Sequence, residues 1–302
     1  MISVIIPTYN AATYLPALLD CLNRQTISHE LIIIDSQSTD NTQAVLRQHQ
    51  IQFTSIPSAS FNHGSTRNLG VNLATYENVI FLTQDALPTD TDTLENLVIA
   101  LTSDDSIAMA YGRQLPYAEA DLLSQFARLT NYPELSRIKS MANIVEMGIK
   151  TCHCSNSFAA YKKTDLQSVG GFPSDTILGE DVSVAARLLL TGKEMAYCAE
   201  ATVFHSHNYT IKEEFKRYFD IGVFHKQQEE VLKPFTKAES EGVKYVLAEW
   251  AYLRINNHSS LIPEQLIRTV VKYIGYRAGQ WHWLLPNWLK RELSMHSSFW
   301  TK

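Results

Sequence analysis

Short apolar runs alternate with segments of helical periodicity along the first part of the chain. The apolar runs predict buried strands at 3–6, 31–34, 51–56 and 79–82. Between these runs, apolar residues recur at helical spacing over 12–24, 42–50 and 68–75. Strands that alternate with helices form a mainly parallel sheet with helices on its faces. The pattern therefore predicts an α/β domain.

The second part of the chain first continues this pattern and then becomes helical throughout. Further strands are expected at 108–111, 155–163 and 201–204. The segment 212–228 has helical spacing, with a buried stripe formed by Phe215, Phe219 and Val223. Helices are also expected at about 239–255 and 264–275. We therefore divide the chain into a catalytic domain over 1–210 and a C-terminal helical region over 211–302.

Polar clusters follow three of the predicted strands. They are Thr8-Tyr9-Asn10, Asp35-Ser36 and Thr83-Gln84-Asp85. The carboxyl ends of parallel strands lie along one edge of a sheet, and ligands of open α/β sheets bind outside that edge. A carboxylate such as Asp85 suits the binding of a metal ion and a diphosphate there, although one Asp alone also fits a simple Asx-turn.

Composition and charge narrow the class of protein. The chain has 302 residues, of which 45% are hydrophobic and 19% charged, as in ordinary globular proteins. No apolar run approaches the roughly 18 residues of a membrane-spanning helix. The N-terminal sequence MISVIIPTYN lacks the basic start of a signal peptide and looks like a first strand. We therefore expect a cytoplasmic protein.

The charge is distributed unevenly. Residues 231–302 contain 10 Lys and Arg against 5 Asp and Glu, whereas the remainder contains 16 against 26. An acidic main body argues against nucleic acid as a partner. The basic tail also carries Trp281, Trp283 and Trp288. Two interpretations stay open for it: packing on the domain or on a second subunit of a homo-oligomer, and peripheral contact with an anionic membrane surface.

The usual sequence signatures of other cofactor sites are missing. No GxGxxG follows the first strand and no GxxxxGK[ST] occurs in the chain, so backbone cradles for NAD or ATP phosphates are not expected. A nucleotide must then be held by side chains and a metal ion. Cys152 and Cys154 stand close together, but their spacing favours reduced thiols over a zinc site.

Taken together, several motifs resemble a known enzyme family. PTYN, DSQSTDNT, GSTRNLG, FLTQDALP and GGFPSDTILGED occur in the order and spacing of family 2 glycosyltransferases of the GT-A fold, across about 1–207. Within that family, FNHGSTRN, TQDALP and HSHNYT followed by FKRYFDIG resemble bacterial rhamnosyltransferases that use dTDP-L-rhamnose to build surface polysaccharides such as O-antigen. The resemblance implies a Rossmann-like sheet, mainly parallel, with a C-terminal helical extension.

The resemblance also implies roles for the matching residues on the donor side. The donor and nucleotide site would comprise Pro7, Thr8, Tyr9, Asp35, Ser36, Arg67, Gln84 and Asp85. Thr83-Gln84-Asp85 stands where relatives carry Asp-x-Asp, which leaves Asp85 as the one carboxylate of the motif. We assign Asp85 and His205 to a metal site for Mn²⁺ or Mg²⁺, with His207 as the second candidate.

On the acceptor side, the catalytic base is assigned to the start of a helix. Inverting transfer needs a base that takes the proton of the attacking hydroxyl group, and we assign this role to Asp181. Acidic residues at a helix start also occur simply as favourable N-terminal charges. Glu180, Asn156 and His63 would contact the sugar or the acceptor, and 119–150 would form an acceptor-side insertion. Arg187, further along the helix, is interpreted as a surface residue.

The sequence hypothesis is thus an inverting, metal-dependent rhamnosyltransferase with a saccharide or polyprenyl-linked saccharide as acceptor. Two alternatives stay open. One is a family 2 transferase for another, UDP-linked sugar, because Ser36 and Thr83 replace residues that are acidic in many relatives. The other is a non-catalytic nucleotide-sugar-binding subunit. A glycosidase is less favoured, because its two carboxylates do not require nucleotide-pocket motifs.

Overall fold

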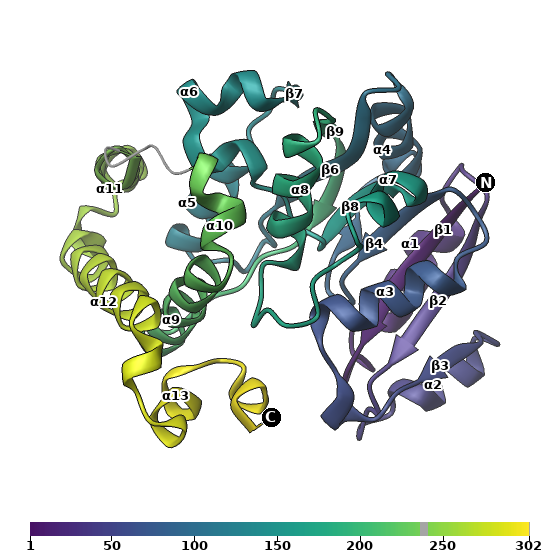
Figure 1. The fold of residues 1–302 in the computed structure, drawn as a ribbon, viewed down its shortest axis with the longest axis horizontal. Coiled ribbons are helices and arrows are strands. Elements are labelled where there is room, and N and C mark those ends of the chain that lie inside the picture. The colour runs from purple at the N-terminus through teal and green to yellow at the C-terminus, as the bar shows by residue number, and fades with distance from the viewer. Residues whose placement is uncertain (236–240, 302) are drawn as a thin grey trace.

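A single twisted sheet forms the centre of the computed structural model, which describes residues 1–235 and 241–301 (Figure 1). It has nine strands in the order β3-β2-β1-β4-β8-β6-β9-β5, with β7 also paired to β9. The strands are β1 Ile2–Thr8, β2 His29–Asp35, β3 Phe53–Ser55, β4 Asn78–Leu82, β5 Leu87–Pro88, β6 Ile107–Leu115, β7 Arg137–Lys139, β8 Phe158–Lys162 and β9 Glu194–Phe204. The predicted α/β fold is confirmed.

Strand direction differs between the two halves of the sheet. β3, β2, β1 and β4 are parallel neighbours, and β6 is parallel to β9. β8 lies between β4 and β6 and is antiparallel to both. The parallel part carries the predicted polar clusters at its carboxyl edge, because β1, β2 and β4 end at Thr8, Asp35 and Leu82.

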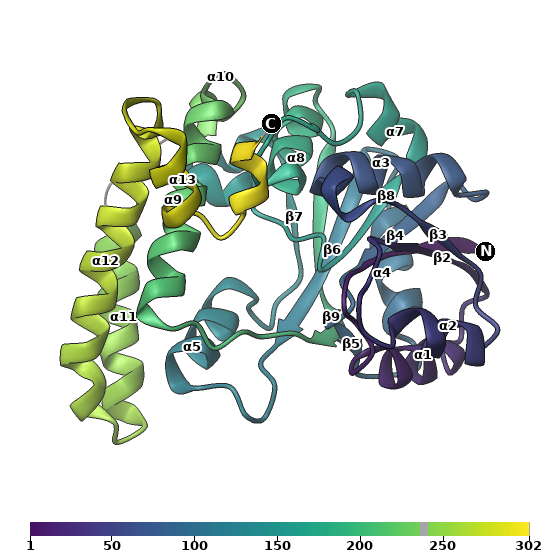
Figure 2. The same cartoon turned by 90° about the horizontal axis from the view of Figure 1, so that it is seen from below.

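Helices cover both faces of the sheet (Figure 2). Along β1, Ile5 belongs to one hydrophobic core, and Val4 and Ile6 belong to the other, as alternation along a strand requires. α3, α7 and α8 lie on the first face, and α1, α2 and α4 on the second. The helices up to α8 are α1 Leu15–Asn23, α2 Thr42–Gln48, α3 His63–Leu73, α4 Thr93–Thr102, α5 Leu122–Asn131, α6 Ile144–Met147, α7 Lys163–Ser168 and α8 Glu180–Leu190.

Two local predictions in this part were wrong. α3 begins at His63 rather than at residue 68, because the Asn62 side chain accepts hydrogen bonds from the backbone N–H groups of Gly64 and Ser65, both at 3.0 Å. Arg187 is not a simple surface residue. Its guanidinium donates to the carbonyl groups of Val169 and Gly171, each at 2.6 Å, and so ties α8 to the turn after α7.

The C-terminal region is helical and packs against the sheet domain. Its helices are α9 Ile211–Gln227, α10 Glu229–Leu232, α11 Glu241–Ile255, α12 Ile262–Gln280 and α13 Asn287–Leu293. Part of the helix predicted over 239–255 lies outside the described residues. Thr210 begins α9 with a capping box, in which its hydroxyl accepts from the Glu213 N–H and the Glu213 carboxylate accepts from the Thr210 N–H. The last residues then fold back toward α9 and α8 (Figure 2).

α9 and α12 cross at very short range. A Cβ atom on Gly279 would lie 2.0 Å from the Phe219 carbonyl oxygen, and one on Gly222 would lie 2.1 Å from the Tyr276 carbonyl oxygen. Only glycine allows this approach. The buried stripe predicted for α9 faces this packing, since Phe219 and Val223 are fully buried. Within residues 1–235 and 241–301, no helix is long and apolar enough to span a bilayer.

Candidate active site

The first and fourth strands are tied together at their carboxyl ends. The Gln84 side chain accepts from the Tyr9 N–H at 2.8 Å and donates to the Tyr9 carbonyl oxygen at 3.1 Å. The Tyr9 ring is half exposed, so one aromatic face is open to a ligand. Pro7, two residues before Tyr9, pairs with Ile34 of β2. The predicted convergence of these strand ends is confirmed.

Asp35 organises the loop after β2 from a fully buried position. Its carboxylate accepts from the Ser38 N–H and hydroxyl, from the Gln43 amide at 2.7 Å and from the Thr8 hydroxyl at 3.4 Å. These donors occupy both carboxylate oxygens. Asp35 therefore holds the loop after β2 in place and does not offer a free acceptor to a nucleotide base. The neighbouring Ser36 hydroxyl is buried and has no hydrogen-bond partner among the residues that the structure describes, and a ligand would satisfy it.

Three side chains converge beyond β4 and β9 and form the Asp-His-His cluster (Asp85, His205 and His207). Asp85 Oδ2 lies 3.5 Å from His205 Nε2 and 3.3 Å from His207 Nε2, and the two imidazole nitrogens are 3.2 Å apart. All the candidate ligand atoms lie within 4.8 Å of one another. The structure thus brings together Asp85, His205 and the second candidate, His207.

Local electrostatics prepare this cluster for a cation. Burial alone would raise the pKa of Asp85, but the hydrogen bond and charge of His205 hold that pKa well below its usual range. Burial lowers the pKa of His207 to about 4, so its imidazole is neutral near pH 7. One carboxylate and two imidazole nitrogens, aimed at one point, form a donor set that fits a divalent metal ion.

Gln114 fixes the orientation of His205, and sequence reasoning missed it. The Gln114 Oε1 atom lies 2.9 Å from His205 Nδ1 and also accepts from Arg128 of α5. A partner on Nδ1 directs Nε2 toward the cluster, which is the arrangement typical of metal-binding histidines. The one available signal was the place of Gln114 near the end of β6, on the same sheet edge.

Glu180 and Arg67 form a buried ion pair near the start of α8. Arg67 Nη1 lies 3.1 Å from Glu180 Oε1, and both side chains are almost fully buried. The Asn156 amide also donates to Glu180 at 3.3 Å. Burial would raise the pKa of Glu180, but Arg67 and then His63 lower it. Arg67, which we expected in the donor and nucleotide site, is thus engaged by Glu180 at the start of α8.

Asp181 lies partly buried beside this pair, in a different environment. Its carboxylate accepts from the Asn156 N–H at 3.0 Å and from the Val182 N–H at 2.8 Å. Burial and the neighbouring charge of Glu180 raise the pKa of Asp181 to about 6. Two adjacent carboxylates with opposite pKa shifts are typical of acid–base sites, where the raised one exchanges protons near neutral pH.

His63 lies beside the acid pair and meets a residue from the end of the chain. Its Nδ1 atom lies 3.4 Å from Arg67 Nη1, and its ring packs edge-to-face with His296 at 5.3 Å between ring centres. Sequence reasoning did not single out His296, because it stands in a polar stretch without any motif. Of the predicted site residues, those of the first two strands and Gln84 gather on one side, and Asn156, Glu180, Asp181 and His63 gather on the other.

The chain matches known proteins in sequence and in fold. The family model for glycosyl transferase family 2 matches residues 3–170. The chain is 45% identical to O-antigen chain rhamnosyltransferase RfbN of Salmonella typhimurium, over 99% of this chain and 96% of that protein. It is 42% identical to O-antigen chain rhamnosyltransferase WbaN of Salmonella anatum, over 99% and 95% of the two chains.

Solved structures with the same fold include distant glycosyltransferases. The mannosyltransferase PcManGT from Pyrobaculum calidifontis, in complex with GDP-Man and Mn²⁺, has a TM-score of 0.62 and 18% identity, over 91% of this chain and 86% of that one. Residues 1–349 of TarS from S. aureus have a TM-score of 0.53 and 16% identity, over 94% and 91%. At such identities the likeness concerns the fold alone.

Proposed function

The chain belongs to glycosyl transferase family 2, and on that premise we propose that it transfers L-rhamnose from dTDP-β-L-rhamnose to a saccharide hydroxyl group, with inversion to an α-L-rhamnoside. The observation that carries this proposal is the 45% identity, over almost the whole of both chains, to an O-antigen chain rhamnosyltransferase. The product would then belong to a cell-surface polysaccharide such as O-antigen.

On the donor side, the residues at the ends of β1, β2 and β4 would bind the nucleotide. The half-exposed Tyr9 ring offers a stacking surface for the base, and the unpartnered Ser36 hydroxyl offers a hydrogen bond. Thr8 and Asp35 hold the loop that carries Ser36. Gln84 keeps Tyr9 in register with Asp85, so that base and diphosphate would be bound by one rigid edge.

The Asp-His-His cluster would hold the metal ion. A divalent cation bound there supplies positive charge that stabilises the dTDP leaving group. Diphosphate oxygens and water would complete the ligand set of such an ion. Two imidazole nitrogens in the donor set favour Mn²⁺ over Mg²⁺, because Mg²⁺ prefers oxygen ligands throughout.

On the acceptor side, Asp181 would act as the general base. A pKa of about 6 leaves it ionised at neutral pH and still basic enough to take a proton from a hydroxyl group. Asn156 donates to both Asp181 and Glu180 and so fixes their mutual orientation. Glu180, neutralised by Arg67, would orient the sugar or the acceptor without competing for the proton.

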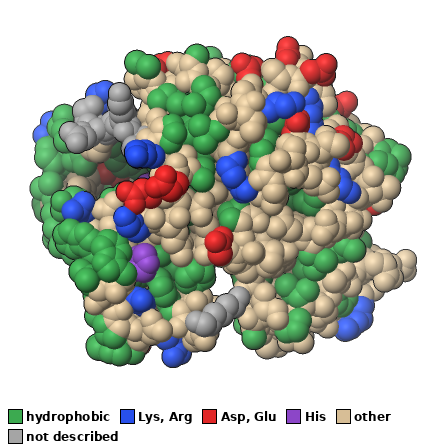
Figure 3. All heavy atoms as spheres, viewed as in Figure 1, with side chains coloured by type: hydrophobic (Ala, Val, Ile, Leu, Met, Phe, Trp, Pro, Cys, Tyr) green, Lys and Arg blue, Asp and Glu red, His purple; other side chains and the backbone are tan. Residues whose placement is uncertain are grey.

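We also propose that the protein is cytoplasmic and contacts the inner face of the cell membrane through its C-terminal region, where a polyprenyl-linked acceptor would lie. α12 and α13 expose an apolar face at the side of the molecule away from the sheet (Figure 3). It comprises Leu266, Ile267, Val270, Tyr273, Ile274, Trp281, Leu284 and Trp288. Arg277, Lys290 and Arg291 accompany it, which suits an anionic surface.

Vesicle flotation tests this contact. Ile274→Asp should reduce binding to phosphatidylglycerol vesicles, whereas Ile99→Asp on α4, at a similarly exposed aliphatic position, should not. Equal binding by both variants would remove the membrane proposal. A dimer that the Ile274 variant dissociates in size-exclusion chromatography would instead assign the face to a second subunit. The division into a catalytic domain over 1–210 and a membrane- or subunit-contacting region over 211–302 is part of the same proposal.

The test of the proposed reaction is consumption of the donor. The enzyme is incubated with dTDP-β-L-rhamnose and Mn²⁺ or Mg²⁺, with and without EDTA, and UDP-sugars are run in parallel. Metal-dependent release of dTDP from dTDP-rhamnose alone is the expected result. Turnover of a UDP-sugar would keep the reaction class and refute the donor. Absence of turnover with every donor would favour a binding subunit.

A further inference from the structure

The end of the chain is clamped onto α9. Asp220, which is fully buried, accepts a hydrogen bond from the Met295 N–H at 2.9 Å. Ser294 is buried as well, and its hydroxyl accepts from the His296 N–H at 2.9 Å. After this turn, the Trp300 ring packs against Phe219 of α9. The turn over 294–296 is therefore a fixed part of the folded protein.

This turn carries His296 to the acid pair. The His296 ring contacts His63, His63 contacts Arg67, and Arg67 pairs with Glu180. Asp181, the proposed base, is the next residue in the chain. His296 is thus connected to the two carboxylates, Glu180 and Asp181, by a continuous series of contacts through His63 and Arg67.

The two imidazoles have hydrogen-bonding capacity that the protein does not use. Neither ring nitrogen of His296 has a partner within residues 1–235 and 241–301, and His63 engages only Nδ1. Burial lowers the pKa of His63 to about 4 and also lowers the pKa of His296. Each neutral ring offers one N–H donor and one nitrogen acceptor. A sugar hydroxyl group, itself both donor and acceptor, is complementary to such a pair.

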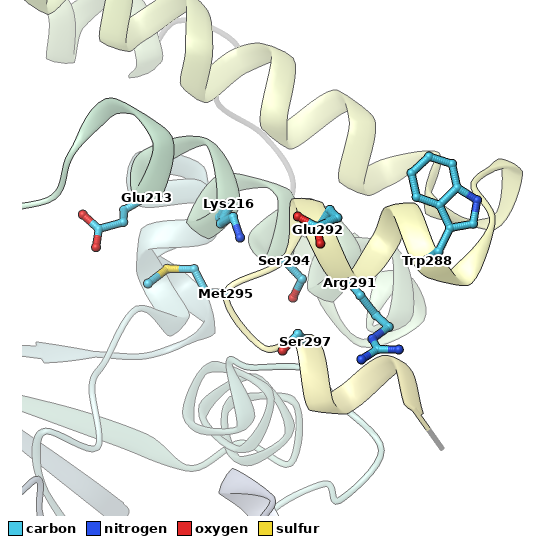
Figure 4. A pocket seen from close by; sticks show the side chains of 8 residues that line it. All are labelled: Glu213, Lys216, Trp288, Arg291, Glu292, Ser294, Met295 and Ser297. Carbon is cyan, nitrogen blue, oxygen red and sulfur yellow. The ribbon is translucent and has the colours of Figure 1, made fainter. Parts of the chain in front are cut away.

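A pocket of about 660 Å³ opens next to this turn (Figure 4). Its walls come from α9 on one side and from α13 with the following residues on the other. They comprise Glu213, Lys216, Trp288, Arg291, Glu292, Ser294, Met295 and Ser297. Met295 lines the pocket and directly precedes His296, so the pocket adjoins the turn that carries His296. Ligand pockets typically have volumes of roughly 300–1,000 Å³, so this one has room for sugar rings.

The charges of the pocket favour a neutral ligand. Lys216 and Arg291 are balanced by Glu213 and Glu292, and the Ser297 hydroxyl lies among them, whereas the buried Ser294 hydroxyl is already engaged by the His296 N–H. A diphosphate would meet both carboxylates, whose repulsion offsets the attraction of the two cations. Hydroxyl groups of a saccharide can instead pair with cations, carboxylates and serines alike.

Building on the proposed function, we propose that this pocket is the acceptor subsite and that His296 and His63 position the acceptor saccharide for deprotonation by Asp181. The C-terminal region would then bind the acceptor saccharide in addition to making the proposed membrane contact. His296 is a positioning residue, since its imidazole would hydrogen-bond a hydroxyl group of the acceptor but would exchange no proton with it. Removal of residues after Gly275 would therefore abolish transfer even from a water-soluble acceptor.

The test compares His296→Ala, His296→Gln and the control His282→Ala. His282 belongs to the same region and contacts Trp300 by ring packing, but it has no contact with His63. The probes are octyl glucoside, galactoside, mannoside and N-acetylglucosaminide, with dTDP-rhamnose as donor. His296→Ala should raise the acceptor KM about 5- to 10-fold, the loss of one hydrogen bond, while the donor KM and the dTDP Kd stay within about twofold.

The remaining variants separate positioning from folding. His296→Gln should recover most of the acceptor affinity because its amide also donates and accepts, and His282→Ala should leave the acceptor KM unchanged. An equal rise of the acceptor KM in His296→Ala and His282→Ala would overturn the proposal, because the effect would then be structural. An unchanged acceptor KM in His296→Ala would overturn it as well.

Binding measured without turnover keeps this test separate from the proposed reaction. Saturation-transfer NMR follows the same octyl hexosides on the enzyme with dTDP and Mg²⁺. Wild-type signals that His296→Ala weakens would support the subsite even if dTDP-rhamnose proved to be the wrong donor. A wild-type enzyme that binds none of these saccharides at millimolar concentration would overturn the subsite, whether or not it consumes dTDP-rhamnose.

Discussion

Replacing Asp181 with Asn should abolish transfer without destabilising the protein at neutral pH. The amide is nearly isosteric with the carboxylate, but it cannot accept the proton of the attacking hydroxyl group. Positioned general bases contribute roughly 10²- to 10⁴-fold to rate, so kcat should fall by that factor. dTDP binding should stay unchanged, because the residues proposed to bind the nucleotide lie at the ends of β1, β2 and β4 and not on α8.

The effect of the substitution on the free energy of unfolding follows from the pKa of Asp181. Its rise from 3.8 to about 6 means that the unfolded chain ionises Asp181 more readily than the folded protein does. Stability is therefore lost as pH rises from about 4 to about 6, by about 3 kcal/mol in total, and the loss stays constant above that range. The Asp181→Asn variant would avoid this loss, but its amide has only one acceptor oxygen, so either the Asn156 or the Val182 N–H would lose its acceptor, which costs about 1–3 kcal/mol.

Above pH 6, the ionisation cost that the variant avoids and the hydrogen bond that it loses nearly cancel. In acid only the loss of the hydrogen bond remains. Urea unfolding at about pH 7.5 should show the variant to be equal to the wild type or up to about 2 kcal/mol more stable. Near pH 4 this advantage should disappear, because Asp181 is then neutral in the folded protein. Wild-type kcat/KM should rise with pH up to about 6 and then level, as the base becomes ionised.

Kinetic and unfolding measurements together can refute this reasoning. Asp165→Asn is the control. Asp165 forms an ion pair with Lys193 at 2.9 Å and is not part of the acid pair. Turnover by Asp181→Asn within about tenfold of the wild type would remove Asp181 from the base role. A variant less stable than the wild type by about 3 kcal/mol at neutral pH would refute the electrostatic part.

Three further predictions concern the metal site, the buried ion pair and the helix crossing. Gln114→Ala should weaken Mn²⁺-dependent dTDP binding about 10- to 100-fold but leave binding in EDTA unchanged, as calorimetric titration would show. Arg67→Met should lower the free energy of unfolding by roughly 3–5 kcal/mol because Glu180 stays buried and unpaired; adding Glu180→Gln should restore most of it. Gly279→Val should lower the melting temperature by separating α12 from α9, whereas Gly242→Val, with open space around it, should not.

Most of the fold could be predicted from the sequence, because strands and helices are signalled by patterns of neighbouring residues. The apolar runs at Val79–Leu82 and Ser3–Ile6 are buried strands, as predicted, since continuous apolar runs suit strands covered on both faces. The polar residues after them converge because parallel strands place their carboxyl ends at one edge. The start of α3 was missed, because the capping side chain of Asn62 lies within a motif interpreted as a loop.

The candidate site depended more on contacts between distant parts of the chain. The sequence by itself determined the strand-end clusters, Asp85 and the acidic pair at the start of α8. Only the tertiary structure decided that Arg67 pairs with Glu180, that Gln114 orients His205 and that His296 reaches His63. These partners are separated by 113, 91 and 233 positions in the numbering, so no periodicity connects them. Their chemistry follows from burial and distance, which exist only once the sheet and the C-terminal helices have packed together.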